Sequence, residues 1–133
     1  MPIFSDTEQF YTCMRAVFAR MAQQDPNSGR AISQAGMILR LNMHDPLAQI
    51  TLDGRHNPVQ TTFGPTSLRP DLEVALSGDT LHRILTGQLT GMSALGAGLL
   101  KVRGPVLRAL ALGELFRQLQ AVYPEVLREQ GLA

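Results

Sequence analysis

Aromatic residues, cysteine and lysine are scarce in this chain of 133 residues. There is no tryptophan, aromatic residues make up 5% of the sequence, and Cys13 and Lys101 are each the single residue of their type. One cysteine excludes an internal disulfide and a cysteine-rich metal site, and it suits a reducing compartment. The six methionines and the apolar share of 44% therefore predict a mainly aliphatic core, within a single domain that spans residues 1–133.

Long apolar runs and blocks of like charge are also missing. No stretch approaches the roughly 20 apolar residues that cross a bilayer, and the polar beginning "SDTEQ" is unlike a signal peptide. Twelve basic and eleven acidic residues nearly cancel, which argues against a nucleic-acid partner. We therefore expect a cytoplasmic protein that binds no nucleic acid.

The sequence shows no catalytic or metal-binding constellation. His44, His56 and His82 lack the spacing of metal ligands, and no G-x-S-x-G motif is present to mark a serine nucleophile. The glycines of "LGAGLLKVRG", residues 95–104, precede a predicted strand. A phosphate-binding loop instead follows a strand and opens a helix. We expect no catalytic residue, no metal and no cofactor, and hence no enzyme.

Apolar periodicity predicts a mixture of helices and antiparallel strands. Ser5 and Glu8 have the spacing of a capping box, and apolar residues then recur at helical spacing from Phe10 to Met21. Further along, apolar and polar residues alternate as in half-buried strands. The predicted strands are residues 37–43, 48–52, 59–63, 71–76 and 99–103. The sequence thus predicts an α+β fold, with one mainly antiparallel sheet covered on one face by helices.

Two helices are expected in the second half of the chain. Asp79 is placed to cap a short one, and Pro105 suits the first turn of a C-terminal one. In the C-terminal helix, Phe116 belongs to the main apolar stripe, whereas Leu107 and Leu110 point to the other side of an ideal helical wheel. Such a segment is deeply buried, kinked near Gly113, or in contact with an apolar ligand.

The second half of the chain resembles the sterol carrier protein type two family, the nonspecific lipid-transfer proteins. The resemblance rests on "DLEVALSGDTLHRILTGQL", on a connection of small residues after it, and on a G-x-L-K-x-x-G strand that here is Gly98 to Gly104. It implies a five-stranded sheet, an apolar tunnel between sheet and helices that takes up fatty acyl chains, sterols or similar lipids, and no catalytic residues. It also implies a strand order with residues 37–43 in the centre beside 71–76, residues 99–103 outside the latter, and residues 59–63 at the opposite edge.

Strand alternation and helical spacing aim a set of apolar side chains at this expected tunnel. The expected lipid-binding residues are the strand positions Leu39, Leu41, Ile50, Val74 and Val102, roofed by Leu85, Met92, Leu95, Leu107, Leu110 and Phe116. The expected function is non-enzymatic binding of an apolar lipid, with intracellular carriage as a further step, by a monomer or homodimer that touches membranes transiently. Two alternatives stay open: a dimerisation or partner-docking module with a filled core, and a small enzyme for an apolar substrate in which His82 or Tyr123 would act.

Overall fold

The structure is a computed structural model that describes residues 2–132, except for the side chains of Val106 and Leu107. Its elements follow one another as α1 (Thr7–Gln24), α2 (Arg30–Ala35), β1 (Ile38–His44), β2 (Ala48–Asp53), β3 (Gln60–Phe63), β4 (Leu72–Ser77), α3 (Gly78–Leu85), α4 (Gly91–Gly96), β5 (Leu100–Arg103), the 3-10 helix η1 (Val106–Ala109) and α5 (Leu110–Glu129).

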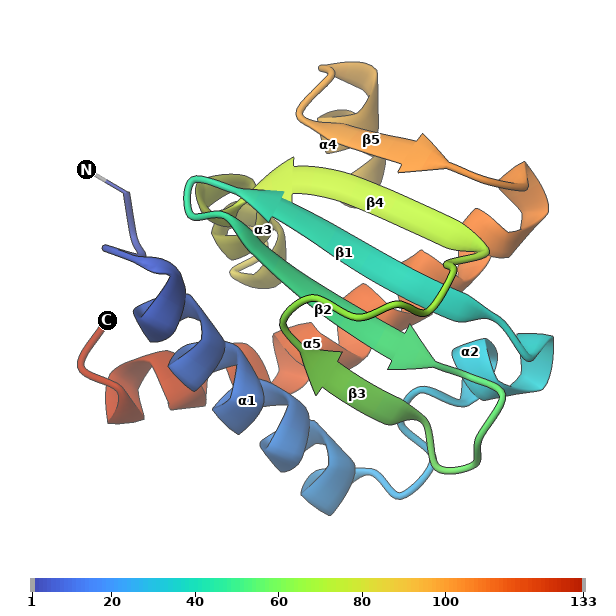
Figure 1. Ribbon diagram of the computed structural model, residues 1–133. Helices are drawn as coiled ribbons and strands as arrows, with labels where there is room; N and C mark the ends of the chain where they lie inside the picture. Colours follow the sequence, from blue (N-terminus) through green and yellow to red (C-terminus); the bar gives the residue numbers. More distant parts are fainter. Residues whose placement is uncertain (1, 133) are drawn as a thin grey trace.

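The five strands form one sheet in the order β3-β2-β1-β4-β5 (Figure 1). β1–β2, β2–β3 and β4–β5 pair antiparallel, whereas β1 and β4 pair parallel, with Leu41 opposite Val74. The predicted α+β class, the mainly antiparallel sheet and the strand order are confirmed. The parallel pair follows from topology, because the chain leaves β3 and crosses β2 and β1 before it enters β4.

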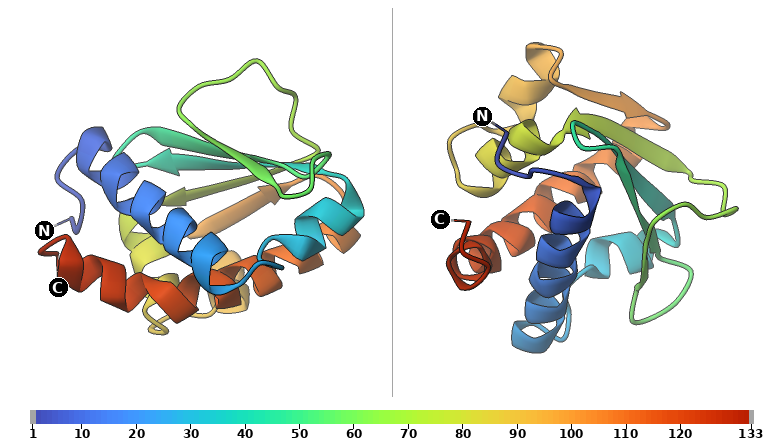
Figure 2. Two further views of the ribbon diagram at one scale, coloured as in Figure 1. Left: turned by 90° about the horizontal axis from the view of Figure 1, so that it is seen from below. Right: turned by 60° about the vertical axis from the view of Figure 1, so that its left-hand side comes forward.

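The helices lie on one face of the sheet, and the loop between β3 and β4 lies on the other (Figure 2). On the helix side, α1 packs against α5, and α3 packs against both α5 and β4. The predicted stripe of α1 is buried in the core that these contacts form: Phe10, Cys13, Met14, Val17, Phe18 and Met21. The apolar side of the sheet is therefore closed by helices, as strand alternation requires.

Helix ends differ from the expectations. Asp6, not Ser5, caps α1, because its carboxylate accepts a hydrogen bond of 2.8 Å from the Gln9 amide. Ser77, not Asp79, caps α3, through its hydroxyl and the Thr80 amide at 3.0 Å. The capping-box prediction was wrong for a local reason: several neighbouring residues carry suitable oxygens, and only the backbone angles select one of them.

Helix α2 was not predicted from the sequence. It has six residues and begins after Gly29, which has a left-handed φ of 75° and provides no side-chain cap. The preceding "DPNSG" reads as a turn. A helix of six residues is marginally stable on its own. Packing of the buried Ile32 therefore stabilises α2, in the absence of a side-chain cap.

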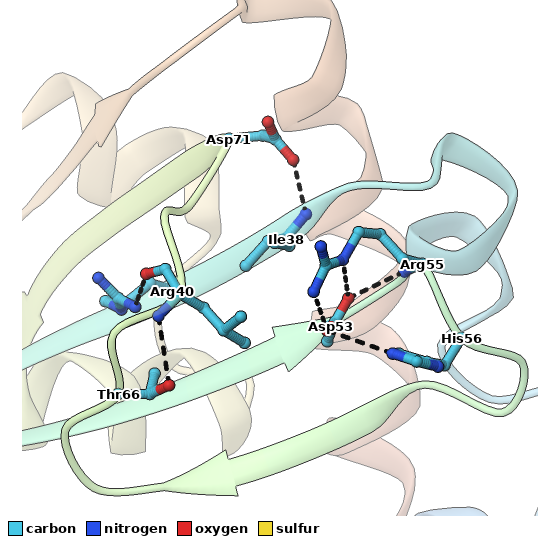
Figure 3. Close-up of polar contacts among 8 residues, drawn as sticks. Ile38, Arg40, Asp53, Arg55, His56, Thr66 and Asp71 are labelled. Carbon is cyan, nitrogen blue, oxygen red and sulfur yellow. Dashed lines mark hydrogen bonds and ion pairs between the residues drawn. The ribbon is translucent and has the colours of Figure 1, made fainter.

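Polar contacts hold one end of the sheet, where β1 begins and β2 ends (Figure 3). The carboxylate of Asp53 accepts hydrogen bonds from the Arg55 amide and guanidinium at 2.8–3.1 Å. Arg40 donates to the Leu68 carbonyl and so fixes the β3–β4 loop over the outer face, and Asp71 accepts from the Ile38 amide at 2.9 Å. We call Ile32, residues 37–40 and residues 53–55, with Asp71, the β2 end.

Candidate functional site

The inner face of the sheet and the helices over it enclose an apolar interior. Leu39 and Leu41 come from β1, Ile50 from β2 and Val74 from β4, each fully buried because alternate residues of a strand point to the same face. Leu85 of α3 and Phe116 of α5 belong to the same buried cluster. Val102 of β5 is partly buried and packs against this cluster, opposite Val74 in the strand pairing. These seven predicted residues come from β1, β2, β4, β5, α3 and α5 and meet in the interior. We call them the inner wall.

Three of the predicted roof residues lie elsewhere. Met92 and Leu110 are 79% and 76% exposed, and Leu95 is 45% exposed. Leu110 is the first residue of α5 and follows the 3-10 turn η1, so the side it presents could not be read from a single helical wheel. The fourth, Leu107, lies outside the described side chains. Of the predicted roof residues whose side chains are described, only Leu85 of α3 and Phe116 of α5 are buried in the interior.

Two polar groups from different helices meet beside the core. The Nδ1 atom of His82, on α3, lies 2.8 Å from the hydroxyl of Tyr123, on α5. Tyr123 is fully buried and His82 is half-buried. Burial lowers the pKa of His82, and the Asp79 carboxylate opposes that shift; burial also raises the pKa of Tyr123. Both groups are therefore neutral near pH 7, and their hydrogen bond links α3 to α5.

The Tyr123 hydroxyl does not resemble an activated nucleophile. A nucleophile needs a lowered acid pKa, whereas burial raises the pKa of this hydroxyl. The nearby thiol of Cys13 is buried, and burial raises its pKa to about 11. A thiol of that kind is a small apolar core group and not a nucleophile.

An open hollow of about 410 Å³ lies between α1 and α5, away from the inner wall. Its apolar floor is Met21 and Val122, and its rim carries Gln24, Asp25, Glu114, Arg117 and Gln118. The hollow opens to solvent between polar and charged rim residues, so it does not enclose a ligand as lipid-binding sites do.

Residues 2–132 contain neither a cluster of metal ligands nor a helix suited to cross a membrane. Within that part of the chain, no three His, Cys, Asp or Glu side chains gather as metal ligands do. None of the helices described there combines the length and hydropathy needed to cross a bilayer. At the β1–β2 turn, Nδ1 of His44 lies 3.6 Å from Oδ2 of the neighbouring Asp45, and both side chains are exposed.

The family model and the solved structures to which this chain is similar point to one protein family. The family model described as the SCP-2 sterol transfer family matches residues 18–117. No curated protein matched the chain. The structure is similar to the sterol carrier protein domain 2 of Helicoverpa armigera, which is 15% identical and has a TM-score of 0.63 over 80% of this chain and 87% of that one.

Two further structures share the fold. Palmitated SCP2L2 from Aedes aegypti is 23% identical, with a TM-score of 0.59 over 79% of this chain and 91% of that one. The UbiJ-SCP2 ubiquinone synthesis protein is 16% identical, with a TM-score of 0.58 over 81% of this chain and 86% of that one. At these identities the likeness concerns the fold.

Proposed function

The chain belongs to the SCP-2 sterol transfer family, and from this premise we propose that it binds one apolar lipid chain at the inner wall, between the sheet and helices α3 and α5. The observation that carries the proposal is the inner wall itself. Six of its seven side chains belong to one buried apolar cluster, and Val102 packs against that cluster. The proposal includes no catalysis, because burial raises the pKa of both the Tyr123 hydroxyl and the Cys13 thiol, so neither is an activated nucleophile.

Burial of area is sufficient to hold such a ligand. Each buried methylene contributes about 0.8 kcal/mol, and micromolar affinity corresponds to about 8 kcal/mol. A long acyl chain therefore reaches that range even after the loss of its freedom is subtracted. The relative from Aedes aegypti carries palmitate, which supports a fatty acyl chain as the ligand class.

Entry of a lipid requires part of the helix layer to move, because protein atoms alone already bury the wall side chains. Helix α4 is weakly anchored in that layer: only Ala94 among its six residues is buried. A Cβ on Gly91 would lie 3.7 Å from the ring of Phe116, so α4 begins beside the inner wall. Segments with few buried contacts open at the lowest free energy, and we therefore place the entrance at α4.

Titration with a fluorescent fatty acid tests the proposal. We expect saturable binding to delipidated protein at about one site per chain, with affinity rising by at most about fourfold for each added methylene. Amide exchange in α4 should slow when the fatty acid is bound, since the entrance closes over it. Saturation without any chain-length dependence, or no saturation in folded protein, would contradict lipid binding and favour a partner-docking module with a filled core.

A matched pair of valine variants locates the site. Val74 of β4 and Val126 of α5 are both fully buried, but only Val74 belongs to the inner wall. Val74→Ala should change the affinity for a long-chain fatty acid several-fold, because the removed methyl groups are ligand contacts. Val126→Ala should leave that affinity unchanged and lower only the free energy of unfolding. Equal effects of the two variants on affinity would place the ligand elsewhere.

A further inference from the structure

One hydroxyl lies inside the apolar core that the described residues form. Tyr123 is fully buried, and it supplies the single hydroxyl of the buried cluster to which the inner wall belongs. In the described structure this oxygen makes one hydrogen bond, to Nδ1 of His82 at 2.8 Å. A hydroxyl has one donor and two acceptor positions, so hydrogen-bonding capacity is left unused at a place that solvent does not reach. A polar group of a ligand can use that capacity.

The hydroxyl lies at the end of the inner wall. Tyr123 follows Phe116 by seven residues, which is two helical turns, so both side chains point to the same side of α5. Leu119, also fully buried, lies between them on that side. The helical rise places Tyr123 about 10 Å beyond Phe116. On α3, His82 precedes Leu85 of the inner wall by three residues and is therefore its neighbour on the helix surface.

The route to this position favours an uncharged head. A lipid head that enters beside α4 passes the apolar inner wall before it reaches Tyr123. The loss of hydration on that route costs a hydroxyl little and a carboxylate far more. The charge near the pair acts in the same direction. Burial is the largest cause of the pKa shifts of His82 and Tyr123, and the carboxylate of Asp79 in addition raises both pKa values, so a second carboxylate is disfavoured there.

We propose that the Tyr123 hydroxyl, positioned by His82, hydrogen-bonds the uncharged hydroxyl head of the bound lipid, so that the chain prefers a lipid alcohol to a fatty acid. The inference rests on the proposed function and names the class of its ligand. The tail lies along the inner wall, from Tyr123 past Phe116 towards α4. A hydroxyl head fits whichever of Tyr123 and His82 donates in their own hydrogen bond, because it both donates and accepts. A fatty acid of the same length remains a ligand, with lower affinity.

Three ligands with chains of equal length test the inference: decanol, decane and decanoate. Each is measured by its displacement of the fluorescent fatty acid from delipidated protein. Tyr123→Phe removes the hydroxyl and keeps the ring. It should weaken decanol binding about two- to tenfold, as expected for the loss of one hydrogen bond, and change decane binding less than about twofold. Near pH 8, the native chain should bind decanoate at least about fivefold more weakly than decanol.

Tyr11→Phe is the matched control, because it removes a hydroxyl at a distance from α3 and α5. The Tyr11 hydroxyl accepts a hydrogen bond of 2.9 Å from the Gln49 amide, and its ring packs against Phe63 of the edge strand β3. This variant should lower the free energy of unfolding and leave all three affinities within about twofold of the native values.

A second measurement uses the native chain without substitution. The imidazole resonances of His82 in nuclear magnetic resonance spectra should shift when decanol is added and much less when decane is added, since only decanol brings a hydroxyl to the pair. His44 and His56 are exposed and serve as internal controls, whose resonances should stay in place with either ligand.

Two results would overturn the inference while lipid binding stands. One is that Tyr123→Phe weakens decanol and decane binding by the same factor, and the other is that the native chain binds decanoate as tightly as decanol. If Tyr123→Phe does not fold, the imidazole shifts decide, and equal shifts with decanol and decane overturn the inference. No saturable binding of any of the ligands to folded protein contradicts the proposed function itself.

Discussion

The β2 end differs from residues 91–110 around the edge strand β5, which we call the β5 margin, in how firmly the chain is held. At the β2 end, Asp53 is bonded to Arg55 at several atoms, Arg40 ties down the β3–β4 loop, and Ile32 is fully buried. At the β5 margin, α4 buries only Ala94, and apolar side chains face solvent. Polar contacts are concentrated where β1 begins and β2 ends, whereas the segments that flank the edge strand β5 are held by fewer of them.

The largest effect is expected for Ile32→Ala at the β2 end. Ile32 is fully buried, and its removal leaves a cavity beneath the turn after β2. The free energy of unfolding should fall by roughly 2–5 kcal/mol, measured by chemical denaturation. A fall of only a few tenths would mean that the β2 end is no more firmly held than the margin.

Gly54→Ala should have the next largest effect. A Cβ at this position would overlap the carbonyl oxygens of Ile32 and Met37, and the Gly54 amide donates to that Met37 oxygen at 2.8 Å. Because these neighbours are backbone atoms, the chain has to shift, at a cost of about 1–3 kcal/mol. Gly96→Ala in α4 is the control: no atom lies within 4 Å of the added carbon, and stability should be unchanged or slightly higher.

Asp53→Asn should cost about 1–3 kcal/mol near pH 7, because charge-assisted hydrogen bonds to Arg55 are lost at a buried site. The effect depends on pH. Hydrogen bonding to Arg55 lowers the pKa of Asp53 to about 2, so the ionised carboxylate stabilises the folded chain above pH 4.

That stabilisation should disappear as the pH falls from about 4 towards 2, where the carboxylate of the folded chain takes up its proton. The measurement is the difference in unfolding free energy between the native chain and Asp53→Asn across this range. A difference that stays constant with pH would show that the charge of Asp53 does not contribute.

The smallest effect is expected for Leu99→Ala in the β5 margin. Leu99 is 41% exposed, and its amide still donates to the Ala94 carbonyl at 2.9 Å after the substitution. The free energy of unfolding should change by less than about 0.5 kcal/mol, measured by denaturation beside Ile32→Ala. A loss comparable with that of Ile32→Ala would remove the contrast between the two regions.

Several features of the fold could be predicted because they depend on neighbours in sequence. The strand positions and the inward direction of Leu39, Leu41, Ile50 and Val74 follow from a period of two residues, and the buried stripe of α1 follows from helical spacing. The strand order was also correct, but it came from the family resemblance, since alternation alone does not say which strands pair.

The exposure of predicted roof residues could not be obtained in the same way. Met92, Leu95 and Leu110 are apolar, but whether an apolar residue is buried depends on what lies opposite it. For Leu110 the preceding 3-10 turn also changes the phase of the helix. The contact between His82 and Tyr123 joins residues 41 positions apart, and no local sequence pattern predicts it.

The sequence by itself determined the class of the fold, the apolar side of each strand and the absence of any catalytic motif, because these depend on residue types and short-range spacing. Tertiary structure alone decided that α2 forms, that Asp6 and Ser77 cap their helices, and that Met92 and Leu95 of α4 face solvent. The physical reason is the same in each case: burial and hydrogen bonding are settled by which segments meet in space, and segments distant in sequence meet only when the chain is folded.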